Sequence, residues 1–246
     1  MKPILLTDLD DTLFQTARKM STAEPSLLVA KGADGKPLSF FYPWQHEFIH
    51  WALEHMIVMP VTARGIKSFQ RVQIPFRHGA VCLHGGVILT PEGEIEPAWH
   101  GLTQALLAPY QARLQHLLKQ GLELGEQAGL DLRGWLESVE NTAVYAVLKS
   151  NRQASDLYQV KQLLLEQLDL EGFYFHQNDN NLALIPLPIS KGQAVAEVLK
   201  RCQISYGRRP VFGMGDSLSD FEFMRQCDFL AFPAKSQLAE QWHDGL

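Results

Sequence analysis

Short apolar runs, each followed by polar or glycine residues, recur along the chain and predict buried β-strands. The runs lie at residues 3–7, 57–61, 80–83 and 210–212. Near-continuous apolar strands are typical of parallel sheets that helices cover on both faces, so this pattern indicates an α/β fold. The polar residues after each run would then lie at the carboxyl ends of the strands, where such sheets bind ligands. The pattern predicts a Rossmann-like, doubly wound parallel sheet.

Apolar residues at helical spacing predict helices between these strands. Residues 45–56 and 191–202 each carry apolar positions three and four apart, and Ser190 is expected to cap the second helix. Ser219 and Glu222 have the spacing of a capping box, which predicts a short helix through Gln226.

The middle of the chain has a different rhythm and predicts an inserted domain. The expected elements are a hairpin-like stretch around 91–93, a long helix through 110–118, strands at 132–139 and 142–148, a helix over 157–168, and strands at 173–177 and 181–187. Residues 178–180 favour a turn between the last two strands. The order αββαββ predicts an α+β cap domain over 86–186, inserted into a discontinuous core of 1–85 and 187–246.

A second insertion is expected inside the core, at residues 15–44. Runs at 27–30 and 38–41 flank Asp34 and Gly35, a pair that favours a tight β-hairpin turn. A hairpin that leaves the end of the first strand is expected to overhang whatever that strand presents.

Composition narrows the function classes. The chain has 246 residues, 46% of them hydrophobic, and 22 Lys+Arg against 27 Asp+Glu give a net charge of −5. This composition excludes disorder as the main state, and without a Lys/Arg-rich block nucleic-acid binding is not expected. Apolar runs are too short for a membrane span or a signal peptide, so the predicted location is the cytoplasm. The three cysteines lie far apart, which predicts reduced core residues rather than disulfides or a zinc site.

Acidic residues directly after the first strand are the sharpest chemical feature. If the segment stays extended, Asp8 and Asp10 point to the same side and Asp11 points away. Two adjacent carboxylates repel each other, and a divalent cation or a shared proton stabilises them. A solvated acidic turn that caps a helix is the structural alternative.

Polar residues at the ends of other predicted elements favour the functional explanation over the solvated turn. Thr62 follows the strand at 57–61, Lys191 opens a helix, and Asp216 and Asp220 follow the strand at 210–212. Each alone has a structural explanation as a helix cap, a surface charge or a turn residue. Their occurrence together, each at a strand or helix end, favours a single site.

In this order the residues resemble the four motifs of the haloacid dehalogenase superfamily. The matching segments are Asp8-Leu-Asp-Asp-Thr12, Thr62, Lys191 and Gly215-Asp-Ser-Leu-Ser-Asp220. The resemblance covers roughly 1–85 and 187–246, and the inserted αββαββ pattern is similar to the large C2-type cap of Cof-like and sucrose-phosphatase-like phosphatases. Asp11 departs from the pattern, since many relatives have glycine there.

The resemblance implies a covalent phosphoryl-transfer mechanism. Asp8 would attack phosphorus to form an aspartyl-phosphate, and Asp10 would protonate the leaving oxygen and later activate water. The implied cofactor is Mg²⁺, held by Asp8, the backbone carbonyl of Asp10, and Asp216. An acid at position 10 favours phosphate-ester chemistry over the dehalogenase and ion-pump branches, which lack it.

Supporting roles follow from the same resemblance. Thr62 and Lys191 would offset charge on the phosphoryl oxygens, and Asp220 would orient Lys191 or a metal-bound water. Thr12 is a supporting residue, and Arg64 is expected either to bind the substrate phosphate or to form an ion pair with the cap. The candidate specificity residues are His84, which stands where related phosphatases have Asn, and the cap residues Arg133, Lys149, His176 and Asn178. The structural alternatives are a hydrogen-bonded structural histidine at position 84 and simple solvation of the cap residues.

The preferred hypothesis is a Mg²⁺-dependent phosphatase that acts on a small phosphorylated metabolite, above all a sugar phosphate. Its partner would be a small phosphate ester, with no nucleic acid and no membrane, and the oligomeric state stays open. Two alternatives remain: a phosphomutase of the same superfamily, and a non-hydrolytic phosphoaspartate signalling or binding module.

Overall fold

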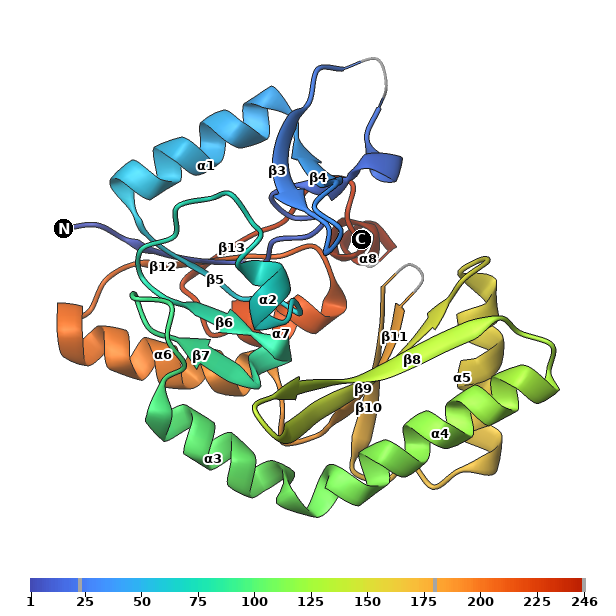
Figure 1. Cartoon of the computed structure of the whole chain (residues 1–246). Helices are drawn as coiled ribbons and strands as arrows, with labels where there is room; N and C mark the ends of the chain where they lie inside the picture. The colour runs from blue at the N-terminus through green and yellow to red at the C-terminus, as the bar shows by residue number, and fades with distance from the viewer. Residues whose placement is uncertain (22–23, 179–180, 245–246) are drawn as a thin grey trace. The chain divides into compact units, whose positions relative to one another are not determined.

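The computed structural model describes residues 1–21, 24–178 and 181–244, which form two compact units (Figure 1). One unit comprises Met1–His100 with Ser190–Leu246, and the other Gly101–Ile189. These limits differ from the boundaries at 86 and 186 expected from the sequence. Strand β7 (Val87–Leu89) stays in the first unit because it pairs with β6 (Ala80–Cys82).

A parallel sheet forms the centre of the first unit and confirms the predicted α/β class. Its strands follow the order β13-β12-β1-β5, with all three neighbouring pairs parallel. Their bounds are Ile4–Thr7 for β1, Ile57–Pro60 for β5, Val211–Met214 for β12 and Phe229–Ala231 for β13. The short run that forms β13 was not among the predicted strands.

The expected parallel strand at 80–83 is partly wrong. A single parallel bridge, Val61 to Val81, joins β6 to the end of β5, and β6 then turns back into an antiparallel pair with β7. The turn is the 3₁₀ segment η2 (Leu83–Gly85), where Leu83 and His84 both have positive φ. Backbone in that conformation cannot continue a strand.

Helices pack on both faces of the sheet, as the doubly wound prediction requires. Ile4 and Leu6 of β1 share a buried cluster with Val195 of α6 (Lys191–Tyr206) and Phe223 of α7 (Leu218–Met224). Leu5, which points to the opposite face, shares a cluster with α1 (Pro43–His55). Short helices α2 (Ile66–Phe69) and α8 (Gln237–Asp244) complete this unit.

Two helix caps lie beside the candidate residues Lys191 and Asp220. Ser190 caps α6 as predicted, since its Oγ accepts a hydrogen bond from the backbone N–H of Gln193 at 3.1 Å. The predicted capping box at 219 and 222 is wrong: α7 begins earlier, and Ser217 with Asp220 forms the box. The same Ser-x-x-acid spacing occurs at both positions, and Ser217 is the one that directly follows the β12 loop.

The predicted hairpin at 27–41 is confirmed. Strands β3 (Leu27–Lys31) and β4 (Pro37–Phe41) pair antiparallel, and β2 (Gln15–Thr16) adds a third strand beside β4. A 3₁₀ turn, η1 (Ala17–Lys19), follows β2. Phe41 packs in the cluster that contains Leu5, so the hairpin is anchored in the core of the first unit.

The second unit has the predicted αββαββ order. Its antiparallel sheet runs β10-β11-β9-β8, with α4 and α5 packed against it (Figure 1). The bounds are α3 Pro97–Leu107, which begins in the first unit, η3 Ala108–Tyr110, α4 Gln111–Gln127, β8 Leu132–Val139, β9 Thr142–Ser150, α5 Ser155–Gln167, β10 Phe173–Asn178 and β11 Asn181–Pro186. Residues 179 and 180 of the turn expected at 178–180 lie outside the described residues.

The three cysteines all lie in the first unit and are free, and Cys82 and Cys202 are buried. Among the helices within the described ranges, none combines the length and the apolar character needed to cross a bilayer.

Gly85 brings the segment after β6 into direct contact with the start of α6. It has φ +101°, and a Cβ there would lie 2.1 Å from the carbonyl oxygen of Ser190. Only glycine allows both this backbone conformation and this approach. The close contact places the start of α6, and with it residue 191, against η2.

We therefore expect Gly85→Ala to destabilise the protein by about 3 kcal/mol or more, the sum of backbone strain and a backbone clash. Gly93→Ala is the matched control, because Gly93 also has positive φ but nothing lies within 4 Å of the place its Cβ would take. The control should lose only the backbone term, about 1 kcal/mol. Urea unfolding measures both; equal losses would contradict the close-contact explanation.

Candidate active site

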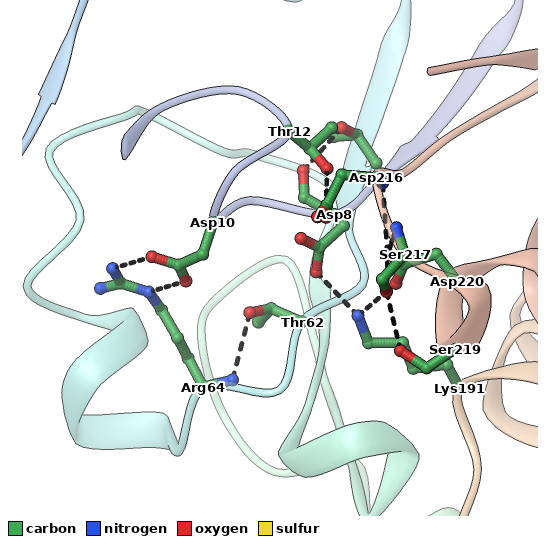
Figure 2. Close-up of polar contacts among 11 residues, drawn as sticks. Asp8, Asp10, Thr12, Thr62, Arg64, Lys191, Asp216, Ser217, Ser219 and Asp220 are labelled. Atoms are coloured by element: carbon green, nitrogen blue, oxygen red, sulfur yellow. Dashed lines mark hydrogen bonds and ion pairs between the residues drawn. The ribbon is translucent and has the colours of Figure 1, made fainter. Parts of the chain in front are cut away.

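A buried ammonium joins carboxylates from the two ends of the chain (Figure 2). Lys191, at the first turn of α6, donates from Nζ to Oδ1 of Asp8 at 2.7 Å and to Oδ1 of Asp220 at 2.6 Å. Asp8 directly follows β1, and Asp220 lies in the first turn of α7. All three side chains are less than a tenth exposed. The structure thus brings together residues that the sequence predicted to share one site.

The loop between β12 and α7 supplies the acidic side of this cluster. Asp216 accepts a hydrogen bond from Oγ1 of Thr12 at 3.1 Å. Oδ2 of Asp220 accepts from the Ser217 hydroxyl at 2.6 Å and from the Ser217 backbone N–H at 3.0 Å. Asp220 is therefore held between Lys191 and the start of α7. The sequence interpretation missed Ser217, although its position three residues before Asp220 was the available signal.

Electrostatics in this cluster favour an additional cation. Burial, together with the charges of Asp220 and Asp216, holds the pKa of Asp8 well above its usual range despite Lys191. Burial and the charge of Asp220 raise the pKa of Asp216 to about 7. Burial opposes the charge of Lys191, but its two carboxylate partners outweigh burial and raise the pKa of Lys191. Full ionisation of these carboxyls would therefore place more negative charge in the cluster than Lys191 can balance.

The donor set fits a hard divalent ion. Oxygen atoms of Asp8, Asp216 and Asp220 lie within 4.8 Å of one another. When all three carboxylates are ionised, the ammonium of Lys191 balances one of them and leaves the other two charges unbalanced. Carboxylate oxygens are the ligands that Mg²⁺ prefers, and a bound dication would offset this charge. The side chain of Asp10 is not in this group, so any contribution to a metal would come from its backbone carbonyl, as expected from the sequence.

Thr62 and His84 lie on adjoining backbone beyond the end of β5. Thr62 is 1% exposed, and its Oγ1 accepts from the backbone N–H of Arg64 at 3.1 Å. Its carbonyl accepts from the backbone N–H of His84 at 3.2 Å. His84 is also buried, in the left-handed turn η2. The two candidate residues are thus neighbours, which their separation in sequence did not reveal.

Asp10 and Asp8 have different cationic partners. Arg64 donates from Nε to Oδ2 of Asp10 and from Nη2 to Oδ1, both at 2.6 Å (Figure 2). The extended geometry expected for this segment does not persist, because β1 ends at Thr7 and Asp11 has φ 64°. Asp11 instead pairs with Lys19 at 2.6 Å. Of the two roles expected for Arg64, phosphate ligand or cap partner, neither describes this contact with Asp10.

The candidate specificity residues of the second unit share one face of its sheet. Arg133 of β8 pairs with Lys149 of β9, which pairs with Asn181 of β11, and Asn181 pairs with Asn178 of β10. His176 lies two residues before Asn178 and so on the same face. Alternate residues of these strands, such as Leu148 and Leu182, pack against α4 and α5 on the other face. The recognition role of these residues stays a prediction.

Several solved structures of hydrolases have folds similar to that of this chain. Sucrose-phosphatase from Synechocystis sp., solved with sucrose and phosphate, is 16% identical with a TM-score of 0.58, covering 99% of this chain and 88% of that one. A haloacid dehalogenase-like hydrolase from Bacteroides thetaiotaomicron is 12% identical with a TM-score of 0.55, and the match covers 100% of both chains. This chain has the haloacid dehalogenase fold.

A third similar structure is the C-terminal domain of trehalose-6-phosphate phosphatase from C. albicans. It is 12% identical with a TM-score of 0.57, and the match covers 99% of this chain and 77% of that one. No protein-family model matches the sequence, and no curated protein matches it either. The likeness to these hydrolases therefore lies in the haloacid dehalogenase fold.

The carboxylate cluster predicts a pH-dependent response to Mg²⁺. The raised pKa of Asp216, about 7 against 3.8 for an ordinary carboxyl, means that the folded metal-free protein binds protons that the unfolded chain has lost. Its stability should therefore fall as pH rises between these values, and a cation should restore it. We expect 10 mM Mg²⁺ to raise the unfolding midpoint by about 3 °C at pH 8 and by less at pH 5.

Asp216→Asn should reduce this Mg²⁺ response at pH 8, as measured by calorimetry or dye-monitored melting. Asp34→Asn is the control, because Asp34 is an exposed carboxylate of the hairpin turn. A Mg²⁺ shift that is the same at both pH values, or unchanged in Asp216→Asn, would remove this cluster as the metal site.

Proposed function

We propose that this chain is a phosphatase of the haloacid dehalogenase superfamily that hydrolyses a small phosphorylated metabolite, a sugar phosphate above all, with Mg²⁺. The observation that carries the proposal is the buried contact of Lys191 with both Asp8 and Asp220, beside Asp216. The sugar phosphatases among the similar structures support it. A fold alone does not determine an activity, so the residues of the site carry the proposal.

Asp8 is the proposed nucleophile. One carboxylate oxygen would form a bond to phosphorus while the ester P–O bond breaks, which gives an aspartyl-phosphate and an alcohol. Attack by a carboxylate on a phosphoryl dianion is opposed by charge. Lys191, already in contact with Asp8 at 2.7 Å, and the hydroxyl of Thr62 would bind the phosphoryl oxygens and lower this barrier. Bound Mg²⁺ would supply further neutralisation of the phosphoryl charge.

Asp10 is the proposed acid and base. It would donate a proton to the ester oxygen as the alcohol leaves, and later take one from the water that hydrolyses the aspartyl-phosphate. Its position two residues after Asp8 places it on the same loop as the nucleophile. Water attack on the aspartyl-phosphate then releases inorganic phosphate and restores Asp8.

Substrate recognition is assigned to the second unit and to His84. Arg133, Lys149, His176 and Asn178 offer donors of the kind that bind hydroxyl and charged groups of a sugar phosphate. They share the sheet face that α4 and α5 do not cover. We propose that this face binds the leaving group of the substrate and selects among substrates.

Asp8→Asn should abolish Mg²⁺-dependent phosphate release, with a loss of about 10⁴-fold or more, because an amide oxygen is a poor nucleophile and cannot form the intermediate. The measurement is phosphate release over a panel of sugar phosphates, nucleotides and phosphorylated acids. Asp11→Asn is the matched control: it removes a neighbouring carboxylate, and asparagine tolerates the positive φ of residue 11. An inactive wild-type enzyme across the panel would refute the proposed function; transfer within one sugar without phosphate release would favour the mutase.

Asp10→Asn should slow the hydrolysis of alkyl phosphates by about 10²- to 10⁴-fold. The hydrolysis of aryl phosphates should slow much less, because aryl leaving groups need little protonation. Rates on a sugar phosphate and on 4-nitrophenyl phosphate test this. Equal losses on the two substrates would show that Asp10 is not the acid.

A further inference from the structure

The contact between Arg64 and Asp10 has no role in the proposed chemistry as described so far. Two N–H···O bonds of 2.6 Å join the guanidinium to both oxygens of the carboxylate. The side chain of Arg64 is 11% exposed and that of Asp10 30%. A bidentate pair at this depth fixes the direction of the carboxylate as well as its charge.

Neighbouring groups hold the guanidinium in place. Nη1 of Arg64 donates to the carbonyl of Ser68 at 3.3 Å, and Nη2 is 3.4 Å from Oγ of Ser39. The guanidinium carbon lies 5.3 Å from the ring centroid of Phe14. The Phe14 ring in turn meets Phe41 edge to face, at 5.9 Å. Ser39 and Phe41 belong to β4, so the inserted hairpin helps to position Arg64.

These contacts occupy four of the five N–H donors of Arg64. Nε and Nη2 face Asp10, and Nη1 faces Ser68. Burial opposes the charge of Arg64, but the bonds to Asp10 outweigh burial and raise the pKa of Arg64 further. A guanidinium turned to Asp10 in this way is poorly placed to bind phosphate, which is one of the two roles expected for Arg64 from the sequence. Lys191 and Thr62 would then be the side chains that bind the phosphoryl oxygens.

We propose that Arg64 is a positioning residue that acts through Asp10, and that the hairpin strand β4 supports it. The inference rests on the proposed function, since it concerns the acid and base of that reaction. Without the guanidinium, the Asp10 carboxylate can rotate away from the leaving oxygen, and small displacements of a catalytic group cost large factors in rate. A lysine in its place would keep the charge but lose the planar two-donor geometry.

The test compares two leaving groups in Arg64→Gln and Arg64→Lys. If Arg64 acts through Asp10, Arg64→Gln should lower kcat on a sugar phosphate by about 10²-fold but on 4-nitrophenyl phosphate by less than about 5-fold, with Arg64→Lys between wild type and Arg64→Gln. Inhibition by inorganic phosphate should stay within about 3-fold of wild type. The ratio of the two rates is taken within one sample, so it does not depend on how much of a variant is folded.

A double variant tests whether the effect passes through Asp10. Adding Arg64→Gln to Asp10→Asn should cost less than about 3-fold more than Asp10→Asn alone, because residues that act as a unit are not additive. Arg71→Gln is the matched control. Arg71 also contacts the hairpin, through a bond from Nε to the carbonyl of Lys31. Its Nη1 donates to the carbonyl of Lys67 rather than to a carboxylate.

Several results would overturn the inference while leaving the phosphatase intact. They are equal losses on both substrates, a rise of about 10-fold or more in the phosphate inhibition constant, or full additivity in the double variant. Any of these would return Arg64 to phosphate binding or to a purely structural role. A wild-type enzyme without phosphatase activity would instead refute the proposed function itself.

Discussion

The ammonium of Lys191, held between Asp8 and Asp220, is the interaction on which the site depends. A charged lysine at 5% exposure requires partners, and here two carboxylates from distant segments supply them. The same contact links the end of β1, the start of α6 and the start of α7. It therefore determines both how the two ends of the chain meet and where negative charge collects.

Backbone geometry makes that meeting possible. The parallel order of β12, β1 and β5 brings the carboxyl ends of three strands to one edge, so that Asp8, Thr62 and Asp216 follow adjacent strands. Gly85 lets η2 approach the carbonyl of Ser190, directly before Lys191. The Ser217 cap orients Asp220 toward Lys191. An excess of carboxylates then remains around Asp8 and Asp216, which suits a divalent ion and a phosphoryl group.

Much of this could be predicted from the sequence, because the relevant signals are local. Apolar runs that end in Asp8 and Thr62 predicted strand ends, and helical spacing after Ser190 predicted α6 and its cap. The sequence did not reveal that Arg64 pairs with Asp10, because that contact depends on the turn at Asp11 and on the hairpin that supports Arg64. It also misplaced the α7 cap, because two serines, 217 and 219, each precede an acidic residue by three positions. The partner of Arg64 and the serine that caps α7 can be identified only from the three-dimensional contacts.

The most direct test of the proposed site is a crystal structure with Mg²⁺ and beryllium trifluoride, a mimic of the phosphoryl group. We expect beryllium bound to a carboxylate oxygen of Asp8, with Lys191 and Thr62 against the fluorines and the metal between Asp8 and Asp216. Beryllium trifluoride bound elsewhere, or Asp8 out of hydrogen-bond reach of Lys191 in that crystal, would contradict the proposed role of this cluster.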